Sequence, residues 1–371
     1  MIHPYTPVAA PTASPLELRH MPVDYGISVQ ATIGRERRTE RAHRMRGFED
    51  RYTDIIDYIV GITEEIWDRK NIGYLHHCYA SDIFKMEDAG VFLGRGLVIA
   101  DTSVVLQSLP DTATFADDCI WAGDDEIGFH TSHRVMLVAR NTGPSELGPP
   151  TGRRVSYWVI ANCVAKDNFI FEEWELSNPG MMMQQLGLDV DQMARSTAAL
   201  TPATHPFAEY IERIDRFRDA PPADAPAPSS DTFDPDSFER FVFHSIWNRR
   251  HLQVIDQVYA STIRFHGTTN RELYGRVQVT EYVLSLLGTF PDLALTVDEV
   301  YWMGNDRDGY KISTRWSAVG THLGHALYGP PTGREVFIWG LVQHTVHRGT
   351  ITDEWSLFNE YHVMQELYRP G

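Results

Sequence analysis

The stretch Gly-Pro-Pro-Thr-Gly-Arg occurs at Gly148–Arg153 and returns unchanged at Gly329–Arg334, 181 residues later. Ile-Trp-Asp-Arg at Ile66–Arg69 returns as Ile-Trp-Asn-Arg at Ile246–Arg249, 180 residues later. Further pairs keep the same order, including Tyr79 with Tyr259, Trp158 with Trp339, Glu173 with Glu354, and Asn178 with Asn359. Such a collinear series indicates a tandem duplication of a module of about 140 residues, the size of a globular domain.

The repeat divides the chain of 371 residues into four parts. We expect two domains at 48–190 and 233–371. They are joined by a linker at 191–232, which begins with a helical pattern and continues as a spacer rich in Pro, Ala and Ser. Residues 1–47 have no counterpart in the second module. This N-terminal arm is expected to pack along a surface or against a partner subunit, which would make the protein a homo-oligomer.

The composition restricts the class of partner and the compartment. Lys and Arg number 33 against 50 Asp and Glu, a net charge of −17, so nucleic acid and anionic membrane surfaces are poor partners. No run of apolar residues is long enough to span a bilayer, and the first residues do not resemble a secretory signal. The three cysteines are widely spaced and contain no CxxC motif, which favours a reducing, cytoplasmic location.

The hydrophobic pattern is the same in both modules. Apolar residues at helical spacing cover 52–66, and alternating segments follow at 128–138, 155–164 and 169–176. In the second module, 310–319 alternates in the same way. Helices followed by a meander of strands predict an α+β fold, in which helices pack on one face of a curved antiparallel sheet.

Four short segments of the second module carry a family resemblance. They are Gly320-Thr321-His322, Gly329–Val336, Ile351–Trp355 and Gln365-Glu366-Leu367, and the first module ends in the related Gln184-Gln185-Leu186-Gly187. In this order they resemble the signature of SnoaL-like polyketide cyclases, which belong to the nuclear transport factor 2 superfamily. The resemblance implies two tandem cone-shaped α+β barrels, each a bent sheet wrapped around N-terminal helices. It also implies an apolar pocket used for cyclisation, isomerisation, dehydration or binding of a small molecule.

The sequence departs from the family at one position of each module. The resemblance implies a general acid/base Asp on the last strand, shortly after a Trp, and that position aligns with Asn178 and Asn359. An amide does not titrate near neutral pH, so these residues are candidates for substrate binding and not for proton transfer. Polyketide cyclisation by the usual route is therefore in doubt.

Histidines are the first candidates for proton transfer because their pKa already lies near 7. His130 and His133 lie three residues apart on a predicted strand, so their side chains point to opposite faces. His133 shares its face with Phe129 and Val135, which makes it the preferred interior residue. The alternative is that each histidine has a structural role, on the surface or hydrogen-bonded in the core. The same parity argues against metal binding by the other HxxH pairs, and no metal site is predicted.

The final hairpin of each module supplies carboxylates. A turn at Asp167-Asn168 would place Asn162 opposite Glu173, and the matching turn in the second module would place His344 opposite Asp353. A His beside a carboxylate is a plausible orienting arrangement for a general base. Glu173, His344 and Asp353 are therefore catalytic candidates. The alternative is that these charges are solvated near the end of the hairpin.

The remaining candidates are residues that would contact a substrate. Arg134 could bind a substrate carboxylate through a bidentate fork, or it could pair with Glu173 to hold the sheet together. Trp158 and Trp339 are expected on strand faces that line the cavity, although an aromatic residue on a curved sheet is more often part of the core. Asn162 is a further candidate, as a polar residue that would contact the substrate.

Together these features predict a cofactor-independent enzyme that uses general acid/base proton transfer on a small, largely apolar molecule, as a lyase, isomerase or cyclase. No dinucleotide-binding, phosphate-binding or nucleophile motif is present. The alternative is a non-catalytic binding or interaction protein in which one or both pockets are retired. A third hypothesis makes only the first module catalytic, because the second has Thr314 where the first has His133.

Overall fold

The computed structural model describes residues 43–88, 90–200 and 233–370, together with Glu212, Asp215, Arg216 and Arg218. Most of the predicted N-terminal arm at 1–47 and most of the linker at 191–232 therefore lie outside the described residues. The expected domain limits at 48–190 and 233–371 remain a prediction. Within the described parts, no helix is long and apolar enough to cross a membrane.

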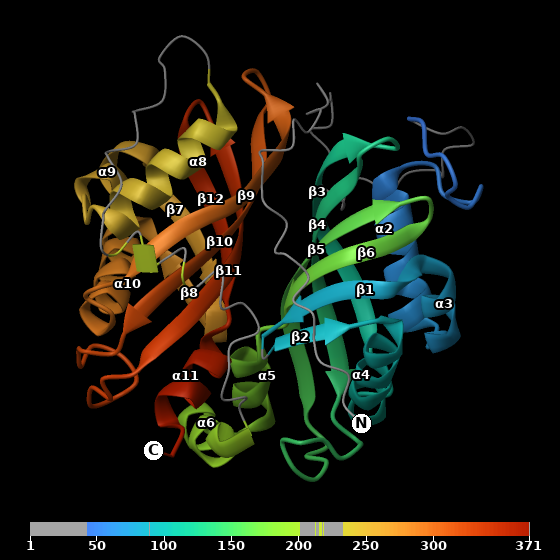
Figure 1. Cartoon of the computed structure of the whole chain (residues 1–371), viewed down its shortest axis with the longest axis horizontal. Coiled ribbons are helices and arrows are strands. Elements are labelled where there is room, and N and C mark those ends of the chain that lie inside the picture. The colour runs from blue at the N-terminus through green and yellow to red at the C-terminus, as the bar shows by residue number, and fades with distance from the viewer. Residues whose placement is uncertain are drawn as a thin grey trace.

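The first module comprises the elements from α2 to η3 (Figure 1). In chain order they are α2 (Ile55–Thr63), the π-helix η1 (Glu64–Asp68), η2 (Ile72–Tyr74), α3 (Leu75–Cys78), β1 (Tyr79–Glu87), β2 (Gly90–Leu93), α4 (Arg95–Ser108), β3 (Ala113–Asp124), β4 (Gly128–Arg140), β5 (Arg154–Lys166), β6 (Phe169–Leu176), α5 (Pro179–Leu186), α6 (Val190–Thr197) and η3 (Ala198–Leu200).

The second module repeats this order. Its elements are α8 (Pro235–Phe243), the π-helix η4 (His244–Asn248), α9 (Gln253–Val258), β7 (Tyr259–Gly267), η5 (Thr268–Asn270), β8 (Arg271–Tyr274), α10 (Gly275–Thr289), β9 (Ala294–Asn305), β10 (Gly309–Thr321), β11 (Glu335–His347), β12 (Thr350–Phe358) and α11 (Glu360–Tyr368).

The first helix of each module starts at a capping aspartate. The Asp54 side chain accepts a hydrogen bond from the backbone N–H of Asp57, and Asp234 does the same for Ser237. These bonds satisfy amide groups that have no partner inside the helix. The buried residues of α2 fall on one stripe, so the sequence orients the helix with that stripe toward the sheet.

Each module contains one six-stranded sheet, in the order β2-β1-β6-β5-β4-β3 and β8-β7-β12-β11-β10-β9. The fold is α+β, as the sequence predicts, but the sheets are not purely antiparallel. The β1 strand runs parallel to β6, and β7 runs parallel to β12, because a long excursion separates these strands in sequence. The sheets are open, so each module is a curved, cone-like half-shell and not a closed barrel.

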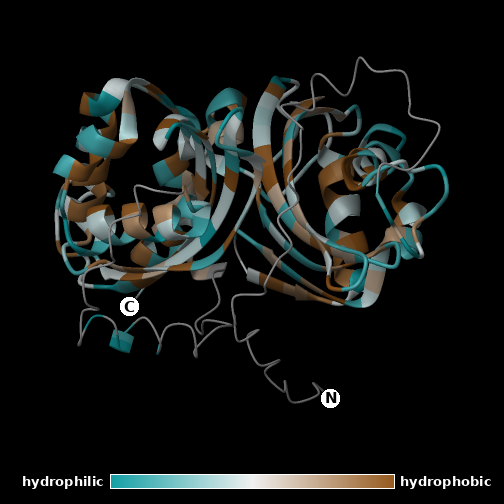
Figure 2. Cartoon of the chain, turned by 90° about the horizontal axis from the view of Figure 1, so that it is seen from above, coloured by the Kyte–Doolittle hydropathy of each residue, from teal (hydrophilic) through white to brown (hydrophobic). Residues whose placement is uncertain are grey.

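The two sheets pack back to back (Figure 2). The helices α2, α3 and α4 lie on the outer side of the first sheet, and α8, α9 and α10 lie on the outer side of the second (Figure 1). Each helix layer forms a core with its own sheet. A third apolar cluster, with Trp158 and Trp174 from one module and Phe337 and Trp339 from the other, fills the space between the sheets.

Because both faces of each sheet are covered, the side chains at alternate positions of a strand are buried on opposite sides of the sheet. One set of side chains faces the helices of its own module, and the other set faces the opposite module. In β4, the odd-numbered residues face the helices, and the even-numbered residues from His130 to Arg134 contact the second module.

The final hairpins turn where the sequence predicts, with positive φ at Asp167, Asn168, Arg348 and Gly349. Both hairpins also contain a β-bulge near the turn, which leaves one extra residue on the last strand, Phe171 in β6 and Thr352 in β12. The bulge shifts the pairing by one residue. Cys163 lies opposite Glu173, and His344 opposite Glu354, so the predicted pairings of Asn162 with Glu173 and of His344 with Asp353 are wrong.

Candidate functional site

The first module encloses a cavity of about 430 Å³ between the concave face of its sheet and its helices. Most of its wall is apolar, with Ile59, Ile62, Trp67, Val98, Val135, Leu137, Tyr157 and Val159 among the lining residues. A space of this volume is within the range of small-molecule sites, which combine apolar walls with a few polar groups.

The polar part of this cavity is a buried cluster around Lys85, which is 5% exposed. The Lys85 ammonium lies 2.5 Å from a carboxylate oxygen of Glu87, 3.1 Å from Glu175 and 3.7 Å from Glu173. Burial alone would favour a neutral lysine, but the three carboxylates raise the pKa of Lys85 well above its usual value. One ammonium therefore faces three carboxyl groups on the parallel pair of strands β1 and β6.

Glu173 is the most buried of these carboxyl groups, at 3% exposure. The Tyr79 hydroxyl donates to it, at 3.1 Å from Oε1, and the Cys163 thiol lies 3.6 Å from the same oxygen. Burial and the charge of Glu175 raise the pKa of Glu173, and Lys85 opposes them. Burial likewise raises the pKa of Glu87. Carboxyl groups whose pKa is raised by burial beside a cavity are frequent among catalytic acids and bases.

His133 lines the same cavity, as the strand alternation predicts. It is 3% exposed, and its Nε2 atom has no hydrogen-bond partner among the described residues. Burial lowers the pKa of His133 to about 4, so its ring is neutral at pH 7. The β5 strand separates His133 from Glu173, which puts the two roughly 10 Å or more apart across the sheet. A small molecule could lie between them.

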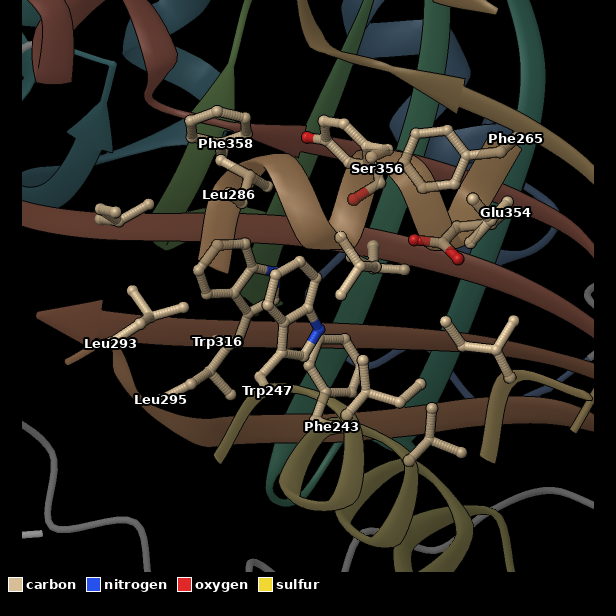
Figure 3. A pocket seen from close by; sticks show the side chains of 18 of the residues that line it. Phe243, Trp247, Phe265, Leu286, Leu293, Leu295, Trp316, Glu354, Ser356 and Phe358 are labelled. Atoms are coloured by element: carbon tan, nitrogen blue, oxygen red, sulfur yellow. The ribbon is translucent and has the colours of Figure 1, made fainter. Parts of the chain in front are cut away.

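Among the described residues, the pocket between the sheet and the helices of the second module has a volume of about 50 Å³ (Figure 3). Aromatic side chains, including Phe243, Trp247, Phe265 and Trp316, fill the corresponding space. Glu354 and Ser356 are the labelled oxygen-bearing side chains in this view. The remaining volume suits one or two water molecules and not an organic substrate.

In the second module, a buried ionic network around His344 takes the place of the cluster around Lys85. His344 Nδ1 lies 2.8 Å from Glu239 on α8, and its Nε2 lies 3.2 Å from Glu354. Thr314 donates to Glu239, and Tyr259 donates to Glu354, at 2.9 Å each. Burial alone would lower the pKa of His344, but the two carboxylates raise it to about 10. His344 is therefore a permanently charged partner of both glutamates at neutral pH.

The two networks share a tyrosine and a glutamate but differ in the cation. Lys85 lies beside Glu173 in the parallel register of β1 and β6, whereas Phe265 lies beside Glu354 in the same register of β7 and β12. His344 supplies the positive charge instead, from the strand position that Cys163 holds in the first module. Of the members of these networks, Glu173 and His344 were predicted from the sequence, whereas Lys85, Glu87, Glu175, Glu239 and Glu354 were not.

Three predicted site residues lie between the modules and not in a cavity. His130 Nδ1 lies 2.7 Å from Glu299 of the second module. Arg134 contacts Asp117 and donates to Gln343, so its predicted pairing with Glu173 is wrong. Asn162 donates to Ser313 across the interface, at 3.2 Å.

The predicted aromatic and amide contacts are also outside the cavities. Trp158 packs edge-on against Trp355, and Trp339 against Trp174, so both belong to the interface between the sheets.

Asn178 accepts a hydrogen bond from the backbone N–H of Thr269, and Asn359 accepts one from that of Trp339. Neither asparagine lines a described cavity, so an amide at these positions removes no acid from either interior. Asp353 is paired with Arg264 and lies opposite Thr345, whereas His344 lies opposite Glu354.

The second module nevertheless contributes to the first cavity. Tyr361, His362 and Gln365 of α11 belong to its lining. The Tyr361 hydroxyl lies 2.9 Å from the Thr197 hydroxyl, and the Gln365 amide donates to the same atom. The α11 helix therefore closes one side of a cavity whose remaining walls come from the other half of the chain.

A comparison with known families assigns a family to the C-terminal half. Residues 240–367 match the family described as SnoaL-like polyketide cyclase. The second module is therefore a SnoaL-like domain. The two similar six-stranded sheets indicate that the chain is a tandem duplication of this fold. Among curated proteins, none matches this chain.

Solved structures with related chains include a protein from Jannaschia sp. CCS1 assigned to the SnoaL-like polyketide cyclases. It has 18% identity and a TM-score of 0.34, and the match covers 39% of this chain and 99% of that one. IdmH from Streptomyces antibioticus, a proposed polyketide cyclase, has 21% identity and a TM-score of 0.32 over 36% of this chain and 99% of its own. A proposed polyketide cyclase from Acidithiobacillus ferrooxidans has 18% identity and a TM-score of 0.31, over 38% and 97%.

Proposed function

We propose that the first module is a cofactor-independent acid/base catalyst and that the second is a structural copy whose pocket no longer binds a substrate. The substrate is a small, largely apolar organic molecule, and the reaction is of the lyase, isomerase or cyclase type. One contrast supports this proposal above all: the first interior keeps about 430 Å³ of space beside titratable groups, whereas the second keeps about 50 Å³. The three cysteines are all buried and free, which supports a cytoplasmic location.

In this proposal Glu173 is the base. Its ionised form removes a proton from a carbon next to a substrate carbonyl, and the raised pKa makes the carboxylate a stronger base than a solvated one. The Tyr79 hydroxyl, which donates to Glu173, holds the carboxylate in place. Lys85 limits the negative charge that accumulates in the apolar interior.

His133 is the second participant. Its neutral ring belongs to the cavity lining and its buried Nε2 has no hydrogen-bond partner among the described residues, so we assign it the polarisation of a substrate oxygen on the far side from Glu173. The separation across β5 leaves room for a ring or a short chain between the two groups. The arrangement suits proton removal at one end of the substrate and polarisation at the other.

Hydrogen exchange tests this proposal before the natural substrate is known. The protein is incubated in D₂O with a panel of small aliphatic and aromatic ketones, and deuterium uptake at the carbons next to the carbonyl is followed by mass spectrometry. We expect uptake above the background rate for at least one ketone. Glu173→Gln should lower this uptake by about 10² to 10⁴.

The matched control is Glu354→Gln, the same change at the equivalent position of the second module. It should leave the uptake per folded molecule unchanged. Equal loss in both variants would overturn the assignment of the first module as the working half. A wild-type protein that binds the ketones but exchanges no hydrogen would instead be a binding protein, the alternative hypothesis.

A further inference from the structure

The lining of the first cavity is unusually acidic for an otherwise apolar interior. Of the described residues that line it, one is a lysine and none is an arginine. Six are carboxylic acids: Glu87, Asp88, Asp101, Glu146, Glu173 and Glu175. His133 is neutral at pH 7, and His362, the other histidine of the lining, has its Nε2 atom 3.5 Å from Glu366. The enclosed space therefore has an excess of groups that favour a positive charge nearby.

Lys85 cannot compensate for this excess, because its ammonium is already within ion-pair distance of three of the acids. In the described part of the chain, Asp101 and Glu146 form no salt bridge, and Asp88 is held by the backbone and hydroxyl of Ser177. Burial raises the pKa of Asp101, and Glu175 and Glu146 raise it further, against the effect of Lys85. The carboxyl groups on α4, β1 and β6 thus repel one another across the cavity.

Two features indicate that the unmatched charge belongs to a ligand and not to packing alone. The space is large enough for an organic molecule. In addition, the buried Nε2 of His133, across the cavity from Glu173, has no hydrogen-bond partner among the described residues, so it is left for a polar group at the other end of the ligand. The apolar walls, with Trp67 and Tyr157 among them, suit the carbon skeleton of the same molecule.

We infer that the ligand of this cavity is a protonated amine carried on an apolar body, with its ammonium group among Asp101, Glu87 and Glu175. This inference rests on the proposed function only in taking the first cavity as the working site. A cation there replaces the protons that the acids otherwise retain, so its binding releases protons to the solvent.

Isothermal titration calorimetry with matched probes tests the inference. Tryptamine, phenethylamine and octylamine are compared at pH 7 with tryptophol, 2-phenylethanol and octanol, which keep each apolar body but replace the ammonium by a hydroxyl. At least one amine should bind about tenfold or more tightly than its alcohol. Titration in two buffers of different ionisation enthalpy should show net proton release. Indole-3-acetate, which carries a negative charge on the same ring system as tryptamine, should bind least.

Asp101→Asn should weaken binding of that amine by about tenfold and change binding of the alcohol by less than twofold. Asp256→Asn, which removes an exposed carboxylate of the second module, is the control and should change neither. Binding of none of the amines, equal binding of amine and alcohol, or equal effects of Asp101→Asn on both would overturn the inference. Because the titration requires no turnover, amine selectivity without hydrogen exchange would refute only the proposed catalysis.

Discussion

Glu173 and Glu354 occupy the same position of their sheets and each accepts a hydrogen bond from the tyrosine that opens the first strand. Their surroundings differ in how the charge is balanced. Glu173 shares one lysine with two other carboxyl groups beside an open space, whereas Glu354 is neutralised within a closed network. A carboxyl group that is incompletely neutralised keeps a raised pKa, as Glu173 does, and this supports the proposal that Glu173 transfers protons.

At the same scale, we predict that His133→Ala lowers substrate hydrogen exchange by about 10² or more, because it removes the free imidazole nitrogen from the cavity. His347→Ala is the control, since His347 is exposed at the end of β11. Deuterium uptake, normalised to folded protein by circular dichroism, measures the effect. Full activity in both variants would remove His133 from the site.

His344→Leu should destabilise the protein strongly, because it leaves Glu239 and Glu354 buried without their cation. The expected loss is about 3–5 kcal/mol in the free energy of unfolding. Glu239→Leu combined with His344→Leu should cost less than the sum of the single changes, since one uncompensated charge then disappears with its partner. Urea denaturation of the three variants checks this, and strict additivity would contradict the coupled network.

The sequence was sufficient to place His133 but not its partners. Alternation along a strand depends only on local geometry, so the opposite orientation of His130 and His133 could be predicted. Alternation does not tell which buried face is the interior, and Trp158 was therefore assigned to the wrong side. Lys85 was missed because it meets Glu173 only through the parallel pairing of β1 with β6, strands far apart in sequence.

At the scale of elements, the bulges in the last strands decide which side chains enter the interior. The turn at Asp167-Asn168 is visible in the sequence, but the extra residue at Phe171 is not, because a bulge has no reliable signature here. One unpaired residue moves Glu173 opposite Cys163 and His344 opposite Glu354. The first helix of the first module and the strands β4, β5, β6 and β10 follow their hydrophobic periodicity, which explains why these elements were predictable and the pairing was not.

The α11 helix is the element through which the second module acts on the first cavity. Tyr361→Ala should weaken binding of the preferred amine probe by about tenfold, because it removes apolar wall area and one hydrogen bond to Thr197. Tyr368→Phe on the same helix, which loses only bonds to Asp191 and Tyr328, should leave the affinity unchanged. Calorimetry compares the two variants. An unaltered affinity in Tyr361→Ala would mean that α11 does not contact the ligand.

At the scale of the whole molecule, charged groups between the sheets fix how the modules meet. Burial alone would raise the pKa of Glu299, but the hydrogen bond from His130 and the charge of Arg315 lower it to about 2. Lys311 reaches across to Asp118 at 2.5 Å. These pairs cross between modules around the tryptophan cluster, so they specify one arrangement of the two sheets.

The acidic cavity should make the stability of the whole chain depend on pH. Burial raises the pKa of Asp88 to about 6. A carboxyl group with a raised pKa holds its proton longer in the folded state, so its contribution is present at low pH and is lost as the pH rises through the folded value. Relative to Asp88→Asn, the wild-type protein should lose on the order of 1 kcal/mol of stability between about pH 4.5 and 7.5.

Urea unfolding of the wild type and Asp88→Asn across this range measures the difference. Asparagine can still accept the hydrogen bonds from Ser177, so the comparison isolates the titration. A difference that stays constant with pH would show that Asp88 is not protonated in the folded protein.

The covalent joining of the two modules has a consequence for how they can change. In a pair of identical subunits every substitution appears twice, so a bulky side chain that fills one interior would fill the other as well. In a single polypeptide that contains both modules, each substitution changes only one of them. Phe265 can therefore fill the interior of the second module while Lys85, at the matching position, lies beside the open cavity of the first. The two modules of one chain can thus take different roles, which identical subunits of a symmetric dimer cannot.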